Sequence, residues 1–151
     1  MDTSHYEKMA TFCSYSERCI SDVTKALEKM EMTPDEMDEI ISLLVKDRFL
    51  DESRYANAYV RDKFRFNKWG KQKMAYMLRQ KGLKENDIQN AFDEISEEEY
   101  ENVLTQILLA KKKSTKSNNP YDLQNKLFRF AAGRGFEPHF IGKTIKKVLE
   151  K

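Results

Sequence analysis

Apolar residues recur along almost the whole chain at intervals of three and four positions. One series consists of Ile20, Val23, Leu27 and Met30. This spacing places apolar side chains on one face of an α-helix, and no stretch sustains the strict apolar–polar alternation of a half-buried strand. The pattern therefore predicts an all-α protein.

Four short polar motifs predict where helices begin. "TPDE" at Thr33–Glu36 offers a threonine N-cap, a proline in the first turn and a glutamate that completes a capping box. "SEEE" at Ser96–Glu99 repeats this logic, and its acids suit the positive end of the helix dipole. "NPYD" at Asn119–Asp122 combines a cap, a proline and an acid, and Asp51 is expected to cap a helix that runs to about Phe66.

The apolar pattern also repeats along the chain. Positions 27, 32, 37, 41 and 44 are apolar, as are the five positions 51 residues later and the five positions a further 53 residues on. Gly82 and Gly135 stand at the same aligned place, where a residue with positive φ would end the preceding helix. Glu31 stands there in the first unit, so we expect its turn to differ.

We expect each repeat to consist of a helix, a short turn and a second helix. In the first two units a third helix is expected to follow, at about 51–67 and 96–113. We therefore predict three tandem three-helix repeats, the third truncated, in an elongated curved array. The expected modules are 1–67, which includes the N-terminal region, 68–114, and 115–151, which begins with a linker.

Charge alternates in blocks along the chain although the net charge is only +2. Residues 1–60 carry 7 cations and 13 acids, and residues 61–81 carry 8 cations and one acid. Residues 82–110 carry one cation and 8 acids, and residues 111–151 carry 11 cations and 3 acids. Such blocks can attract an anionic partner where the total charge would not.

Motifs for catalysis and metal binding are missing from the sequence. It holds two histidines and no zinc-protease, P-loop, nucleophile-elbow or dinucleotide-binding motif. The two cysteines, Cys13 and Cys19, suit reduced structural thiols. We therefore expect no enzyme activity, no metal and no cofactor. The absence of an export signal or a long apolar run favours a cytoplasmic protein without membrane contact.

The stretch "RDKFRFNKWGKQK", Arg61–Lys73, holds six cations, one acid, two phenylalanines and the only tryptophan. On a helix, Arg61, Arg65 and Lys68 would share one face while Val60 and Phe64 point to the core. These cations suit phosphate groups or an acidic protein groove. Trp69 could stack on a binding partner, anchor an interface or pack between modules.

Two segments carry a resemblance to a known family. "FLDESRYANAYVRDKF" (Phe49–Phe64) followed by "GKQKMAYMLRQKGL" (Gly70–Leu83) resembles the core signature of the RecX family of recombinase regulators. Tyr15–Lys29 and Lys126–Ile145 are similar to the family's N-terminal and C-terminal repeats. One departure is Arg48, where a small residue often precedes the apolar pair, and another is Met77 in place of a frequent acid.

The resemblance implies a non-catalytic protein that binds the RecA–DNA filament. It would oppose filament growth, strand exchange, the RecA ATPase and RecA-stimulated cleavage of the SOS repressor, and so modulate DNA repair. The expected partners are RecA and, by weak direct contact, the single-stranded DNA in the filament, and we expect a monomer. A helical nucleic-acid-binding protein that acts through phosphate contacts and a generic helical adaptor remain alternatives.

The candidate binding residues are the cations of the two basic blocks together with the tryptophan. They are Arg61, Lys63, Arg65, Lys68, Trp69, Lys71, Lys73, Arg79, Lys81, Lys111, Lys112, Lys113, Arg129 and Arg134.

Overall fold

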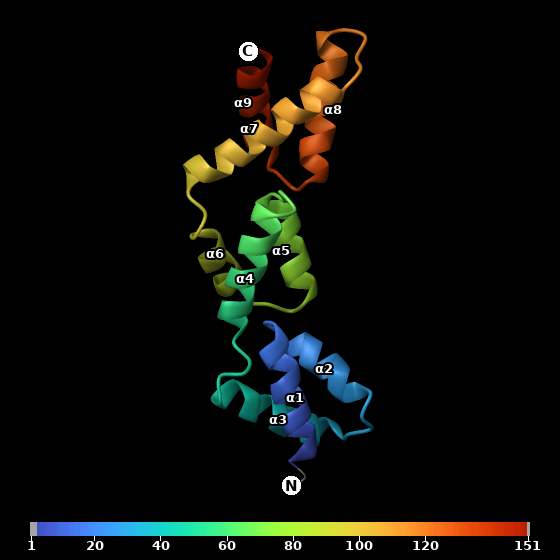
Figure 1. The fold of residues 1–151 in the computed structure, drawn as a ribbon, viewed down its shortest axis with the longest axis vertical. Coiled ribbons are helices and arrows are strands. Elements are labelled where there is room, and N and C mark those ends of the chain that lie inside the picture. Colours follow the sequence, from blue (N-terminus) through green and yellow to red (C-terminus); the bar gives the residue numbers. More distant parts are fainter. Residues whose placement is uncertain (1–2, 151) are drawn as a thin grey trace. The chain divides into compact units, whose positions relative to one another are not determined.

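A computed structural model describes residues 3–150 and contains nine helices and no strand within that range (Figure 1). The helices are α1 (Ser4–Tyr15), α2 (Ile20–Glu28), α3 (Pro34–Lys46), α4 (Glu52–Arg65), α5 (Lys71–Gln80), α6 (Glu85–Phe92), α7 (Glu97–Ser114), α8 (Pro120–Gly133) and α9 (Pro138–Leu149). The predicted all-α class is confirmed. Residues 1, 2 and 151, which the predicted end modules include, lie outside the described range.

The helix starts predicted from polar motifs are confirmed by hydrogen bonds. The Thr33 hydroxyl accepts the Glu36 N–H at 3.2 Å, and the Glu36 carboxylate accepts the Thr33 N–H at 3.2 Å, which completes the capping box. Asp51 accepts the Arg54 N–H at 3.0 Å at the start of α4. The side chains at 96 and 119 cap α7 and α8 in the same way. Each cap satisfies an N–H that the first turn leaves without a helical partner.

The described residues form two compact units that interleave along the chain. Unit 1 holds the residues up to Tyr59 together with Leu78–Ala91, and unit 2 holds Val60–Met77 together with the residues from Phe92 onward. The division into modules at 1–67, 68–114 and 115–151 stays a prediction.

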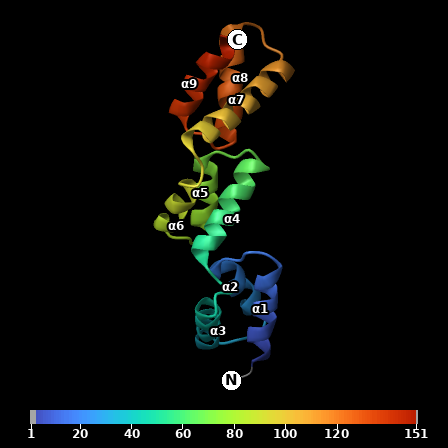
Figure 2. The same cartoon turned by 60° about the vertical axis from the view of Figure 1, so that its left-hand side comes forward.

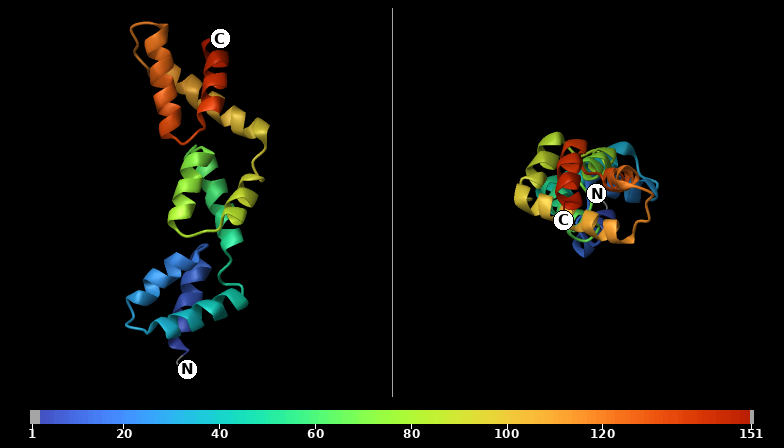
Figure 3. Two further views of the ribbon diagram at one scale, coloured as in Figure 1. Left: turned by 180° about the vertical axis from the view of Figure 1, so that it is seen from behind. Right: turned by 90° about the horizontal axis from the view of Figure 1, so that it is seen from above.

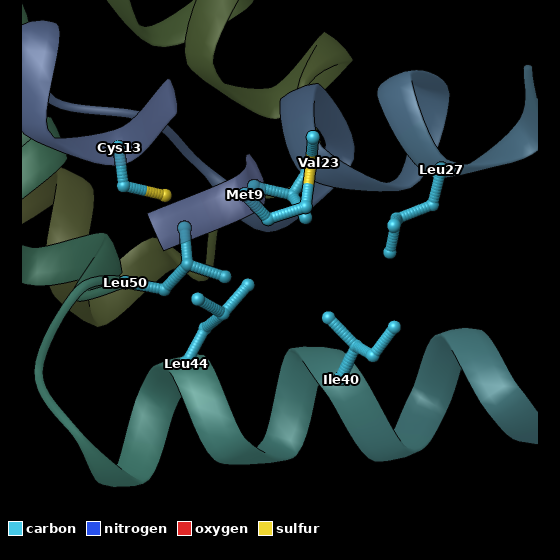
Figure 4. Close-up of a cluster of buried hydrophobic side chains, with 7 residues drawn as sticks. All are labelled: Met9, Cys13, Val23, Leu27, Ile40, Leu44 and Leu50. Carbon is cyan, nitrogen blue, oxygen red and sulfur yellow. The ribbon is translucent and has the colours of Figure 1, made fainter. Parts of the chain in front are cut away.

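Unit 1 is built around α1, α2 and α3, which gather together in Figure 2. Its core contains seven buried side chains that point into one cluster (Figure 4): Met9, Cys13, Val23, Leu27, Ile40, Leu44 and Leu50. Both cysteines are free and buried, and burial raises the pKa of each thiol. This fits the structural role expected for them.

Unit 2 contains α7, α8 and α9, and all three pack against one another (Figure 3). Their buried side chains recur at helical spacing, as the sequence predicted: Tyr100, Leu104, Leu108, Leu127, Ala131, Ile141, Ile145 and Val148. Within residues 3–150, every helix is too short or too polar to span a bilayer.

All three aligned turns contain a residue with positive φ at the aligned position. Gly82 has a φ of 83° and Gly135 a φ of 95°, as expected for residues that end a helix in the left-handed region. Glu31 has a φ of 53°, so the expectation that its turn would differ was wrong. A residue with a β-carbon takes this conformation at a cost of about 1–2 kcal/mol, which packing of the repeat can offset.

Candidate functional site

The end of α4 places its side chains as predicted up to Arg65. Val60 and Phe64 are each 1% exposed, whereas Arg61 and Arg65 are exposed. Lys68 departs from the prediction, because α4 ends at Arg65 and Lys68 has a φ of 57° in the following turn. It therefore does not continue the α4 face that Arg61 and Arg65 share.

The turn that follows α4 packs backbone to backbone against the turn between α8 and α9. The Gly70 N–H donates to the Arg134 carbonyl at 2.8 Å, and the Gln72 N–H donates to the Gly135 carbonyl at 3.0 Å. The Arg134 guanidinium returns a hydrogen bond to the Asn67 carbonyl at 2.9 Å. A β-carbon on Gly70 would lie 2.4 Å from the Phe136 nitrogen, so only glycine fits this approach.

Tyr100 at the start of α7 lies at the centre of this joint. Its ring stacks on Phe64 at 5.8 Å and contacts Phe136 at 5.1 Å between ring centroids. Its hydroxyl accepts the Lys71 N–H at 2.9 Å and donates to the Glu137 carboxylate. Burial, followed by the hydrogen bond to Glu137, raises the pKa of Tyr100 far above its ordinary value. The joint is therefore a buried, hydrogen-bonded aromatic cluster that fixes the 61–73 stretch within unit 2.

Trp69 is half-buried beside the same joint and lies between two lysines. The Lys73 Nζ lies 4.5 Å from the indole ring, and the Lys63 Nζ lies 5.0 Å from it. Cations over an indole face are attracted by its quadrupole and keep their charge. The indole thus holds two lysine ammonium groups close to one another on unit 2.

Five further candidates lie in unit 2, four of them on α7 and α8 and Arg134 in the turn after α8. The Lys111 Nζ lies 5.0 Å and the Arg134 guanidinium 5.2 Å from the Phe130 ring. Lys112 donates to the Val148 carbonyl at 3.1 Å, whereas Lys113 and Arg129 are exposed. Lys71, whose ammonium lies 4.7 Å from the Tyr100 ring, is half-buried.

Arg79 and Lys81 differ from the other candidates because both fall in unit 1 and are paired with acids. Arg79 forms an ion pair with Glu85, and Lys81 pairs with Asp22 at 3.0 Å. Burial alone would raise the pKa of Asp22, but hydrogen bonds from the Cys19 N–H and from Lys81 lower it. A paired cation offers less charge to a partner, so these two are the weaker candidates.

Two exposed aromatic residues were missed by the sequence reasoning. Phe66 is 82% exposed at the end of α4, and Tyr76 is 60% exposed on α5. Phe66 lies two positions after the buried Phe64, and this displacement from the apolar stripe was the signal available. A single exposed aromatic residue is common on protein surfaces, but Phe66 stands among arginines and lysines, which is the composition of an interface hot spot.

Arg54, a residue of the family signature, has a structural role. The Arg54 guanidinium pairs with Glu17 at 2.6 Å and donates to the Arg48 carbonyl at 3.1 Å, which ties the loop before α4 to unit 1. Arg48 has a φ of 65°, a conformation that glycine adopts without strain. Glycine at this position would therefore relieve the strain that Arg48 carries.

Comparisons with known proteins agree with the signature. The family model described as "RecX, second three-helix domain" matches residues 51–91, the segment of α4–α6. Regulatory protein RecX of Clostridium botulinum strain Eklund 17B is 30% identical over 118 residues, which cover 76% of this chain and 54% of that protein. The protein of the same name from strain Alaska E43 is 33% identical over 114 residues, covering 72% and 51%. The chain thus spans about half the length of the curated relatives it matches.

Solved structures share the fold. A crystal structure of regulatory protein RecX has a TM-score of 0.87 at 22% identity and covers 95% of this chain and 71% of its own. A crystal structure of RecX from Lactobacillus salivarius has a TM-score of 0.86 at 22% identity and covers 99% and 97%. Signature, family model, relatives and fold agree, and the chain belongs to the RecX family of regulatory proteins.

Proposed function

We propose that the chain is a non-catalytic regulator that binds the RecA–DNA filament in the cytoplasm. By occupying the filament it opposes filament growth, strand exchange, ATP hydrolysis and the co-protease activity, and so restrains DNA repair and the SOS response. The observation that carries the proposal is family membership, which the match at residues 51–91 and the relatives named regulatory protein RecX support.

The surface best suited to contact the filament lies at the end of α4 and the start of α5. We call it the α4–α5 surface and define it as Arg61, Lys63, Arg65, Phe66, Trp69 and Lys73, all of which belong to unit 2. Phe66 supplies exposed apolar area, while Trp69 and its two lysines supply charge. Asp62 is the only acid among residues 61–73. An exposed aromatic among cations resembles the hot spots that dominate protein interfaces.

The joint beneath this surface supports the assignment. Gly70 and Tyr100 fix the turn that carries Trp69 by hydrogen bonds to the backbone and to Glu137. A surface held by such contacts loses little conformational freedom when it binds, which favours affinity.

ATP hydrolysis by RecA on single-stranded DNA tests the proposal. Added to RecA with single-stranded DNA and ATP, the chain is expected to lower the hydrolysis rate progressively as it approaches molar equivalence. A variant combining Phe66→Ala, Arg61→Glu and Arg65→Glu is expected to inhibit at least tenfold less well.

The matched control carries Tyr15→Ala, Lys25→Glu and Lys29→Glu in unit 1. These changes remove one exposed aromatic ring, 80% exposed, and reverse two exposed cations, so they alter net charge by the same amount. The control should inhibit like the unaltered chain. No inhibition by the unaltered chain at molar equivalence would refute the proposed function, and equal inhibition by all three proteins would refute the role of the α4–α5 surface.

A further inference from the structure

A second basic feature of unit 2 lies between the end of α7 and α8. It is a groove of about 520 Å³, open to solvent. Its lining consists of Lys111, Ser114, Thr115, Lys116, Lys126, Arg129 and Phe130. Four of these seven residues are cations and none is an acid.

Three of the four cations in this groove form no ion pair within the described residues, although Arg129 also interacts electrostatically with Asp122. Lys111 rests on the Phe130 ring at 5.0 Å, and Arg134 contacts the same ring at 5.2 Å. Contact with an aromatic face positions a cation without cancelling its charge. By contrast Lys126 is paired with Asp122 at 3.1 Å, the only acid among residues 111–134, which hold seven cations.

The wall of the groove is ordered by side-chain hydrogen bonds to the backbone. The Ser114 and Thr115 hydroxyls donate to the Lys111 carbonyl at 3.2 and 2.5 Å. These bonds give a partner to a carbonyl in the last turn of α7. Lys126 on α8 donates to the Lys116 carbonyl at 2.7 Å and so holds the connecting segment against α8. The cations of the groove are therefore carried by segments that side-chain hydrogen bonds hold in place.

We propose that this groove binds the sugar–phosphate backbone of a single strand of nucleic acid. A positively charged groove that follows the backbone is the usual device of proteins that bind single strands without sequence preference. Lys111, Lys116 and Arg129 would each neutralise phosphate charge. The inference rests on the proposed function only in taking the bound strand to be the single-stranded DNA of the RecA filament. Binding to a free oligonucleotide needs no RecA.

Fluorescence anisotropy with a labelled oligothymidylate, titrated at several salt concentrations, tests the groove. The variant combines Lys111→Gln, Lys116→Gln and Arg129→Gln. Its control combines Lys25→Gln, Lys29→Gln and Lys46→Gln, three exposed cations of unit 1. Each phosphate contact to a single strand contributes about 0.7 to the steepness of log affinity against log salt. Losing three contacts should therefore reduce that slope by about 2 and weaken low-salt binding by about tenfold or more. The control should change both far less.

Equal losses in the two variants would overturn the proposal, because binding would then follow net charge alone. Tighter binding to a duplex of the same length, lost in the groove variant, would overturn the assignment to single strands. Failure of the unaltered chain to bind the oligothymidylate at low salt would overturn the proposal outright. If the chain leaves RecA hydrolysis unchanged while the groove variant loses oligothymidylate, the proposed function fails and the groove assignment stands.

Discussion

Substitution of Gly70 by alanine should disrupt the joint that supports the α4–α5 surface. Gly70 has no positive φ, so alanine is compatible with its backbone conformation and the effect is steric. The added β-carbon would lie 2.4 Å from the Phe136 nitrogen and 2.5 Å from the Gly135 carbonyl carbon. Real β-carbons do not approach backbone atoms this closely, so the two turns must separate.

The cost can be worked from the contacts that separation breaks. The two backbone hydrogen bonds between these turns contribute about 1 kcal/mol each. Displacing packed backbone adds about 1 kcal/mol at the lower end of overpacking penalties. The total is about 3 kcal/mol, which at a urea dependence of about 2 kcal/mol per molar moves the midpoint down by about 1.5 M.

Urea unfolding followed by circular dichroism measures the effect, and Gly133→Ala is the matched control. Gly133 lies at the end of α8, and a β-carbon there would meet nothing within 4 Å. Alanine should therefore leave stability unchanged or raise it by about 0.5–1 kcal/mol. A Gly70→Ala midpoint equal to that of the unaltered chain would refute the close approach of the two turns.

Three further changes test separate contacts by urea unfolding. Glu31→Gly should raise stability by about 0.5–1 kcal/mol, because glycine relieves the strain of positive φ but loses more chain entropy; a loss of stability would contradict the φ of 53°. Tyr100→Phe should cost about 1–3 kcal/mol by leaving the Glu137 carboxylate without its hydroxyl donor; an unchanged midpoint would show that water replaces it. Lys81→Met should cost less than about 1 kcal/mol at neutral pH, since Lys81 is partly exposed. Because the pKa of Asp22 is lowered in the folded protein, this ion-pair contribution is present above the ordinary aspartate pKa and is lost as pH falls through the folded value. A loss of stability in Lys81→Met that does not change with pH would contradict the pairing.

Features set by neighbouring residues were predictable from the sequence. The Thr33 capping box and the inward stripe of Val60 and Phe64 depend on residues within one or two helical turns, and both are confirmed. The errors at Glu31 and Lys68 share one cause. Both residues adopt positive φ without being glycine, because packing elsewhere compensates a local cost that sequence rules treat as decisive.

The charge pattern located cations but not their partners. Lys81 pairs with an aspartate 59 positions away, and Arg134 donates to a carbonyl 67 positions away. Such contacts follow from the fold, so a single sequence cannot distinguish a neutralised cation from an available one. The close approach of Gly70 to Gly135 was hidden for the same reason, although a glycine beside aromatic residues was a signal of it.

Co-sedimentation with preassembled RecA filaments tests whether the chain binds the filament through the α4–α5 surface. Filaments formed on single-stranded DNA with a slowly hydrolysed ATP analogue would be sedimented with the unaltered chain, with the Phe66→Ala, Arg61→Glu, Arg65→Glu variant, and with its unit 1 control. We expect the chain and the control to sediment with the filament and the variant to stay in the supernatant. Sedimentation of the variant to the same extent as the chain, or of none of the three proteins, would contradict it.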